Sequence, residues 1–186
     1  MSIAQLESHP SAYGILDFIA GRFYNSQHVC VLGTQVVTAD VLRASPLWVT
    51  RAVTVTDLSL DITTGAAGSA RLGIYLDSLT VPGTPGALVA DGGAFSTTLG
   101  VKTSTVNAAL VPGLYWLASV FSGAPTVRSL SNAAGDVLVT MGFTSNLDTT
   151  LHVGVSVAFT FAALPDPFTA GSVLAATHIP CVRVTL

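Results

Sequence analysis

Hydrophobic and polar residues alternate along most of the chain, from about Val36 to Leu186. The clearest stretch is 151–161, where large apolar residues occupy every second position, and residues 70–76 repeat the pattern. A period of two is typical of a strand with one buried face. Turn sequences rich in Gly, Pro, Asn and Asp, such as 81–86, separate these stretches. The pattern predicts an all-β fold, a single antiparallel, jelly-roll-like β-sandwich of roughly eight to ten strands.

Two stretches depart from simple alternation. Between residues 53 and 62 the apolar positions switch from odd to even near Asp57, which predicts a β-bulge, because a one-residue slip would otherwise turn half of the strand outward. Residues 114–121 are apolar on both faces. They are interpreted either as a central strand covered on each side or as a subunit interface.

The N-terminal segment follows a different period. Apolar residues at Tyr13, Leu16, Ala20 and Phe23 have helical spacing, while two glycines weaken a helix there. The segment is predicted to be a short helix or an irregular tether. The expected division is an attachment segment at 1–27 and a sandwich domain at 28–186.

Charged residues make up only 9% of the chain, with Lys102 as its one lysine and Glu7 as its one glutamate. Such a surface is typical of a protein partly covered by other subunits, so we expect an oligomer. A monomer with a Ser, Thr and Gly-rich exterior is the alternative. The net charge of −3 disfavours a nucleic-acid partner. No apolar run is long enough for membrane insertion, and the N-terminus lacks the features of a secretory signal.

The sequence offers little support for catalysis, and we expect no enzyme, cofactor or metal. Ser156 lies in the string nearest to a nucleophile elbow, but that string is mid-strand. Aspartates mostly flank turns, where they accept local backbone hydrogen bonds. Metal-ligand spacing is absent from the histidines, which are His9, His28, His152 and His178, and from the cysteines, which are Cys30 and Cys181. The two cysteines are expected to be buried free thiols.

Exposed aromatic rings offer another possible activity, because sugar rings stack on Trp and Tyr while Asp and Arg bond their hydroxyls. One set of candidates lies on the expected non-core face of strand 70–76, and the other lies in apolar strands. The alternative is that these aromatics belong to the core or to an interface. The candidates are Tyr75, Arg71, Asp77, Trp48, Tyr115 and Trp116.

Three segments resemble a module that is frequent in bacteriophage virion proteins, namely tail fibres, spikes and capsid-attached fibres. They are 68–75 (GSARLGIY), 85–92 (PGALVADG) and 110–118 (LVPGLYWLA), and the resemblance covers roughly residues 50–130. It implies a jelly-roll-like fold, homotrimers and a place on the virion exterior, and it identifies no catalytic or binding residue. By analogy, the N-terminal segment docks on other head or tail proteins through Tyr13, Leu16, Phe18, Ile19 and Phe23.

The leading interpretation is a structural virion appendage of the fibre or spike type that displays its sandwich to a host-surface glycan. A purely architectural capsid decoration or fibre-base protein is the second interpretation. A bacterial lectin-like module and a glycan-degrading enzyme are the others. Exposure of Tyr75, Trp48 and Trp116 distinguishes the first interpretation from the second.

Overall fold

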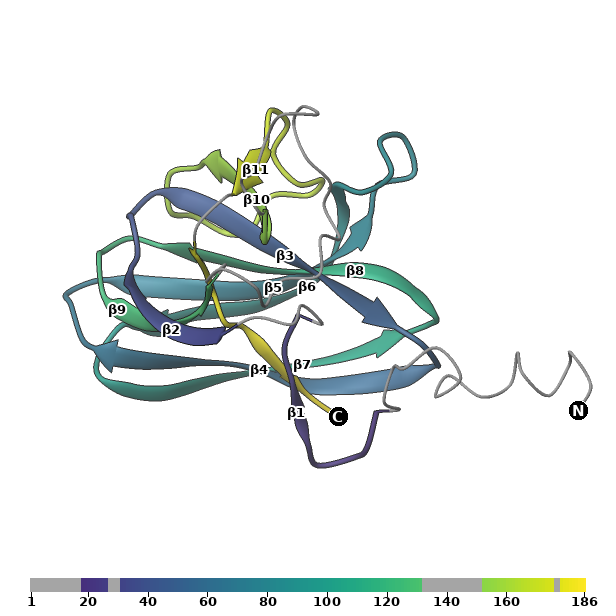
Figure 1. Cartoon of the computed structure of the whole chain (residues 1–186), viewed down its shortest axis with the longest axis horizontal. Helices are drawn as coiled ribbons and strands as arrows, with labels where there is room; N and C mark the ends of the chain where they lie inside the picture. The colour runs from purple at the N-terminus through teal and green to yellow at the C-terminus, as the bar shows by residue number, and fades with distance from the viewer. Residues whose placement is uncertain (1–17, 27–30, 132–151, 176–177) are drawn as a thin grey trace, which may run out of the picture.

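The computed structural model describes residues 18–26, 31–131, 152–175 and 178–186 (Figure 1). Within these ranges the chain forms strands and no helix, arranged in a seven-stranded and a six-stranded antiparallel sheet that pack face to face. The predicted all-β sandwich is confirmed. The strands are β1 (Phe23–Tyr24), β2 (Val31–Val36), β3 (Val41–Val49), β4 (Val53–Thr64), β5 (Ser69–Asp77), β6 (Pro85–Ser96), β7 (Gly100–Leu110), β8 (Gly113–Phe121), β9 (Thr126–Ser131), β10 (Gly154–Ala158), β11 (Val173–Ala175), β12 (His178–Pro180) and β13 (Arg183–Thr185).

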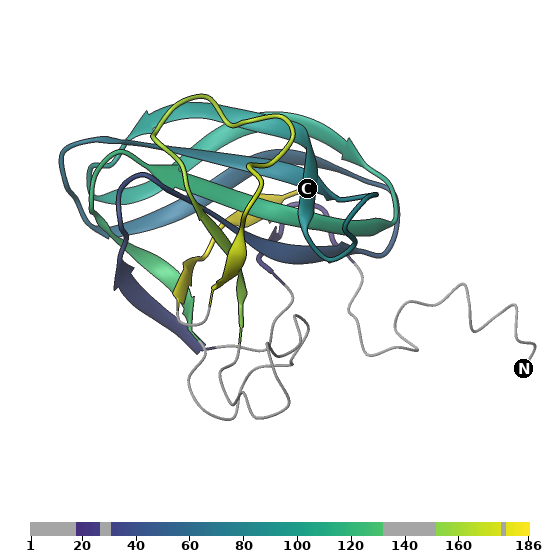
Figure 2. The same ribbon diagram turned by 90° about the horizontal axis from the view of Figure 1, so that it is seen from above.

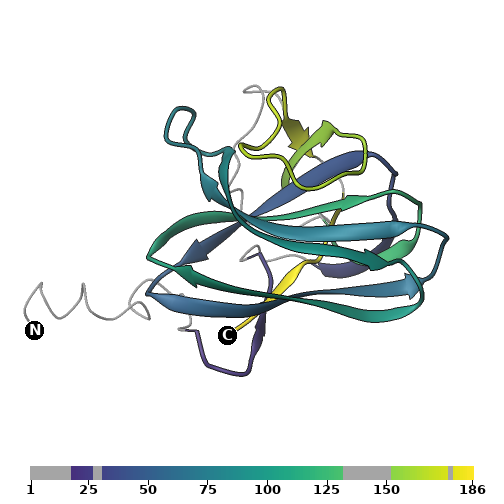
Figure 3. The same cartoon turned by 180° about the vertical axis from the view of Figure 1, so that it is seen from behind.

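The eight strands β2 to β9 have the topology of a jelly roll. In the seven-stranded sheet the pairing order is β2-β9-β4-β7, and in the six-stranded sheet it is β3-β8-β5-β6. The chain crosses to the other sheet at every connection except the β5–β6 hairpin, as two Greek keys require. Figure 3 shows both layers from behind. The predicted jelly-roll-like arrangement is therefore present.

The C-terminal strands enlarge both sheets. β10 and β11 continue the six-stranded sheet beyond β3. In the other sheet, β4 and β9 pair only at Ile62–Val127 and Thr64–Thr126. Beyond these pairs, β12 lies against β9 and β13 against β4, so residues 178–186 fill the opening between the two strands. β1 pairs with the other edge of β13.

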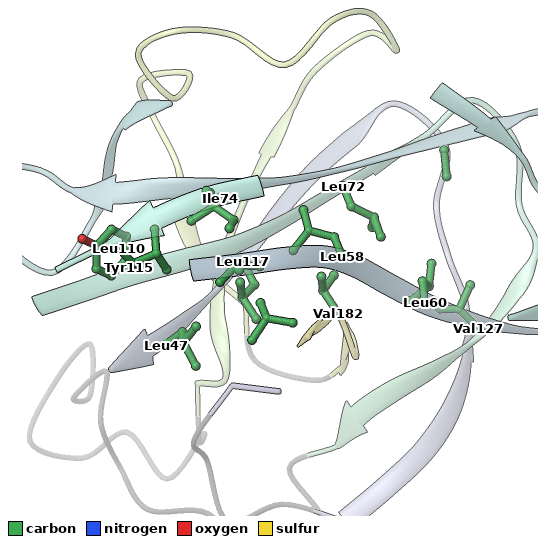
Figure 4. Packing of buried hydrophobic residues seen from close by; sticks show 14 of the residues in the cluster. Leu47, Leu58, Leu60, Leu72, Ile74, Leu110, Tyr115, Leu117, Val127 and Val182 are labelled. Carbon is green, nitrogen blue, oxygen red and sulfur yellow. The ribbon is translucent and has the colours of Figure 1, made fainter. Parts of the chain in front are cut away.

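The main core lies between the two sheets, where the inward residues of alternating strands meet. Leu58, Leu60 and Ile62 of β4 face Leu72 and Ile74 of β5 across this space. Figure 4 shows these leucines converging with Leu117 of β8 and with Val182, which immediately precedes β13. Each such side chain is fully buried, which stabilises the fold by about 1.5–3 kcal/mol apiece.

A second apolar layer covers the outer face of the six-stranded sheet. Trp116 and Val120 of β8 lie on this face, and Leu164 and Phe168 pack over it. These last two belong to residues 159–168, called the strap below, which crosses the sheet as the yellow-green loop in Figure 2. The interpretation of 114–121 as a central strand covered on each side is confirmed. Its outer face is covered by the same chain, so the alternative of a subunit interface is wrong for this face.

The predicted bulge occurs where the alternation changes. The register between β4 and β7 shifts between Val55 and Asp57. One residue of β4 separates these two, whereas two residues of β7 separate their partners Ala108 and Thr105, so the additional residue belongs to β7. Asn107, one of those two, has a φ of 49°, the left-handed conformation that a bulge tolerates in Asn. The predicted bulge and its position are confirmed, with Val55 and Leu58 of β4 both facing the core on either side of it.

The expected boundary at residue 27 is wrong, because the described part of the N-terminal segment belongs to the sandwich. Phe18 is buried in the main core and meets the ring of Tyr24 edge to face, 4.8 Å away. Phe23 and Tyr24 form β1, and the Ser26 hydroxyl donates a 2.6 Å hydrogen bond to the carbonyl of Pro46. Residues 1–17, on which the predicted helix or tether mainly depends, lie outside the described residues.

The strand expected at 151–161 is shorter than its alternation suggests. β10 ends at Ala158, and Leu151 lies outside the described residues. The amide of Phe159 donates a 2.9 Å hydrogen bond to the carbonyl of Asp40. The amide of Phe161 donates a 2.8 Å hydrogen bond to the carboxylate of Asp40. These bonds turn the chain out of the sheet and begin the strap.

Candidate functional site

Three of the four aromatic ligand candidates are buried. Tyr75 and Trp116 have no exposed surface and Tyr115 has almost none. Tyr75 and Trp116 do lie on the outer face of their sheet, as the alternation required, but the strap covers that face. Tyr115 points into the main core, where its hydroxyl exchanges 3.1 Å hydrogen bonds with the backbone of Val111. The expectation that these rings are available to a sugar is therefore wrong.

The structure does bring several of the candidates together. Tyr75 pairs directly with Trp116 across β5 and β8. The Trp116 indole Nε1 donates a 2.9 Å hydrogen bond to Oδ1 of Asp77, two residues beyond Tyr75. The amide of Gly83 donates to both carboxylate oxygens of Asp77, at 3.2 and 3.1 Å. Asp77 thus fixes the β5–β6 loop and satisfies the buried indole.

Tyr75 contacts the inner side of the strap through its hydroxyl and its ring. Its hydroxyl donates a 2.9 Å hydrogen bond to the carbonyl of Pro165, and its ring meets Phe168 edge to face at 5.1 Å. Burial raises the pKa of the Tyr75 phenol, and the negative charges of Asp91 and Asp166 raise it further. The phenol is therefore a neutral donor, suited to packing under the strap.

Arg71 also serves the internal structure. Its Nη1 lies 2.7 Å from Oδ2 of Asp91, and both side chains are largely covered. The same carboxylate oxygen accepts the amide of Leu164 at 3.2 Å, while Oδ1 accepts the amide of Gly93 at 2.9 Å. The Arg71–Asp91 pair joins β5, β6 and the strap.

Trp48 is the one exposed aromatic among the candidates, with 49% of its surface accessible. It lies opposite Leu114 at the end of β3, beyond Ala44, the last β3 residue that pairs with β10. Pro46 lies between Ala44 and Trp48, where β3 no longer pairs with β10. A proline lacks a backbone N–H, so it leaves no unpaired donor on this free edge of β3. Trp48 lies on the same outer face as Trp116, two residues along β3 from its partner Pro46, whereas Tyr115 faces the main core, so the six candidates do not form one site.

A hollow on the outer face of the seven-stranded sheet brings together side chains that the sequence did not single out. It lies where β4 and β9 separate, and its empty volume is about 240 Å³, open to solvent. The lining residues are Ser59, Leu60, Asp61, Val101, Arg128, Cys181 and Arg183. They come from β4, β7, β9 and the C-terminal segment, and no local motif connects them.

The charges of this hollow are only partly matched. Nε of Arg128 lies 3.5 Å from Oδ2 of Asp61, and both side chains are about one third exposed. Arg183 lies on β13 opposite Ser59. Among the described residues, its guanidinium has no hydrogen bond or ion pair. The thiol of Cys181 is free and buried, and it accepts a 3.6 Å hydrogen bond from the Asn25 amide.

The N-terminal residues expected to bind a virion partner have different environments. Phe18 is part of the core and is not available to a partner. Ile19 and Phe23 are exposed, with 48% and 61% of their surfaces accessible. Tyr13 and Leu16 lie outside the described residues.

The described residues contain no group of three or more His, Cys, Asp or Glu side chains close enough to hold a metal ion. His152 is buried. His9, His28 and Cys30 lie outside the described residues, as does the side chain of His178. Ser156 lies within β10, paired to strands on both sides, and no helix follows it in the described chain. In the described part there is also no helix of the length and hydrophobicity that a membrane span requires.

Comparison with known proteins finds no family model that matches the chain and no similar curated protein.

Proposed function

We propose that this chain is a structural protein of a bacteriophage virion, a fibre or spike-type appendage subunit on the exterior of the particle. The observation that carries the proposal is the eight-stranded jelly roll of β2 to β9, an architecture used by viral capsid and lectin domains. The three segments that resemble virion appendage modules lie on β5, β6 and β7–β8, inside this jelly roll. The step from fold to function is an analogy.

The internal use of the polar groups supports a structural role. Arg71, Asp77 and Tyr75 have the chemistry of a sugar-binding site, yet each bonds to another part of the chain. A protein that uses its few charged residues to hold loops and a strap is suited to a durable particle component. The proposal therefore includes no enzymatic activity.

Attachment is proposed to involve residues 1–17 together with Ile19 and Phe23. These two exposed apolar side chains lie four residues apart in the chain, one before β1 and one in it. Exposed apolar residues close together mark contact surfaces more often than free surface. Phe18, which packs into the core, is not included in this contact.

A homotrimer is proposed as the assembled form. Its support is a surface with few charges that exposes large apolar residues in several loops and on β7. Among them are Leu79, Leu99, Val101 and Val111, each more than 60% accessible. Light scattering tests this proposal, and a clean monomer of 19 kDa at micromolar concentration would contradict it.

The virion location is tested by labelling. Gold-conjugated antibodies raised against the recombinant chain should decorate intact particles of the phage that encodes it, at a fixed position on head or tail. Antibodies against the chain that label host cells and no particle would instead favour a bacterial lectin-like module.

A purely architectural decoration or fibre-base protein is the second candidate, and the burial of Tyr75 and Trp116 favours it. Receptor binding through an aromatic ring then depends on Trp48. A glycan array probed with the full chain and with Trp48→Ala distinguishes the two. Binding that the substitution abolishes supports adsorption through this ring, whereas no binding by either protein supports the architectural role.

A further inference from the structure

We propose that the hollow between β4 and β9 binds the carboxylate of an acidic sugar through Arg128 and Arg183. Arg presents a planar set of donors that matches a carboxylate in two-pronged geometry. The hollow contains two guanidinium groups and one carboxylate, so its local charge is positive in a chain of net charge −3. A small anion is therefore drawn to this place on the chain.

The construction of the hollow explains why the two arginines face it. β4 and β9 separate after Ile62 and Val127, and the amide of Cys181 bonds to the carbonyl of Arg128 at 2.9 Å as the chain crosses between them. β13 then pairs with β4 and places Arg183 next to Ser59. One arginine thus enters from each side of the opening, and Cys181, whose thiol is free, is also among the lining residues.

The partners of the arginines leave donors available. Arg128 contacts Asp61 at 3.5 Å through Nε, beyond ordinary charge-assisted hydrogen-bond length, and this interaction leaves its terminal nitrogens for a ligand. Arg183 has no partner among the described residues. The hydroxyl of Ser59 adds a donor or acceptor for a sugar hydroxyl, and Val101 adds an apolar wall.

The size of the hollow limits the ligand. The enclosed part of the hollow has a volume of only about 30 Å³, which admits a carboxylate but not a sugar ring, so the ring would lie on the exposed surface beside it. A ligand of this size in an open hollow binds weakly, with a Kd on the order of 1 mM. Repetition of the site in an oligomer would raise the avidity of such weak contacts.

The source of the sugar, a host-surface glycan, rests on the proposed function, while the carboxylate chemistry rests on the hollow alone. The test is titration of the ¹⁵N-labelled full chain with sodium glucuronate, followed by amide chemical shifts. We expect saturable shifts at Ser59, Asp61, Val101 and Arg183, and none with glucose. Absence of saturable shifts at 20 mM glucuronate, roughly twenty times the expected Kd, would overturn the proposal.

Three variants test the residues. Arg183→Gln should weaken glucuronate binding at least tenfold, and Arg22→Gln, which removes an exposed arginine just before β1, should leave it unchanged. Asp61→Asn removes the competing carboxylate and should tighten binding several-fold, a gain that misfolding cannot produce. Equal weakening by Arg183→Gln and Arg22→Gln would contradict a specific site.

Inorganic phosphate serves as a second ligand. If glucuronate binds and phosphate does not displace it, the site recognises carboxylates, as proposed. If phosphate binds more tightly and displaces glucuronate, the site is a phosphate site and the acidic-sugar proposal fails. Neither result depends on virion labelling, so a failure of this site and a failure of the proposed function are separate outcomes.

Discussion

At the scale of single residues, the polar side chains best suited to binding a ligand have structural roles. Tyr75, Arg71 and Asp77 combine a phenol, a guanidinium and a carboxylate on one strand, but each bonds to the strap, to β6 or to the β5–β6 loop. A buried polar group contributes to stability only when its hydrogen bonds are made, and its loss leaves a partner unsatisfied. The consequences are measurable for Tyr75 and for Asp91.

Replacing Tyr75 with Phe should change how stability depends on pH. The pKa of the phenol is raised in the folded protein above its ordinary value of 10, so the folded state keeps a proton that the unfolded chain releases. Stability from this group is complete below about pH 10 and falls as the pH rises further. Tyr75→Phe should lower the free energy of unfolding by about 1 kcal/mol at pH 7, through the lost bond to Pro165, and reduce its decline above pH 10. Urea unfolding from pH 7 to 11 measures both, and an unchanged alkaline slope would contradict the assignment.

Asp91 joins three parts of the fold, and Asp91→Asn should be costly. The substitution removes the ion pair with Arg71 and weakens the acceptor for the Leu164 amide. Since hydrogen bonds to charged groups contribute about 1.5–3 kcal/mol when buried, and this pair is partly exposed, we expect a loss of about 1–2 kcal/mol. The control is Asp57→Asn, which affects a single bond from the Thr105 hydroxyl and should cost less than about 0.5 kcal/mol. Similar melting temperatures for the two variants would show that Asp91 has no special role.

At the scale of elements, the strap determines which surface the six-stranded sheet exposes. Leu164 and Phe168 cover Tyr75 and Trp116, and bonds to Asp40, Asp91 and Tyr75 hold it along its length. The strap also explains the local requirement for glycine at position 73. A Cβ there would lie 2.2 Å from Cδ1 of Leu164 and 2.8 Å from the carbonyl oxygen of Ala90.

Phe168→Ala should loosen the strap and expose Trp116. The chain has two tryptophans, and Trp48 is exposed, so the experiment uses a Trp48→Phe background in which fluorescence reports Trp116 alone. With Phe168 present, emission should be blue-shifted and resist acrylamide quenching. With Ala, emission should shift to the red and stability should fall by about 3–5 kcal/mol, as for other buried phenylalanines. The matched control is Phe23→Ala, which removes an exposed ring and should leave both readouts unchanged.

At the scale of the whole molecule, the sequence predicted what depends on local pattern and missed what depends on distant contacts. Alternation was sufficient for the sandwich, and the two departures from it for the position of the bulge near Asp57 and for a strand at 114–121 with two covered faces. It could not reveal that the strap covers Tyr75. The strap has no regular hydrophobic period, and it lies far from β5 in the sequence, so the two come into contact only in the folded chain. The hollow of Arg128 and Arg183 was missed for the same reason, since its lining extends from residue 59 to residue 183.

The start of the folded unit was also misplaced, and two truncations can locate it. Helical spacing up to Phe23 suggested a separate segment, whereas Phe18 is buried in the core and β1 pairs with β13. A chain that begins at residue 28 loses the buried Phe18 ring, the β1–β13 pairing and the Ser26 bond to Pro46. A chain that begins at residue 18 keeps all three.

The chain 28–186 should therefore be less stable than 18–186 by several kcal/mol, since removal of a buried phenylalanine alone costs about 3–5 kcal/mol. Urea unfolding of both truncations measures the difference directly. Phe18→Ala in the full chain is the companion variant, because it removes the core contact and keeps the strand pairing. The loss of stability in this variant should account for most of the difference between the truncations. If 28–186 matched 18–186 in stability, the boundary at residue 27 would be restored and Phe18 would be a peripheral contact. If Phe18→Ala and the truncation to 28–186 are both costly, the segment that enters β1 is part of the sandwich. Any partner docking at the N-terminus then binds a surface continuous with the core.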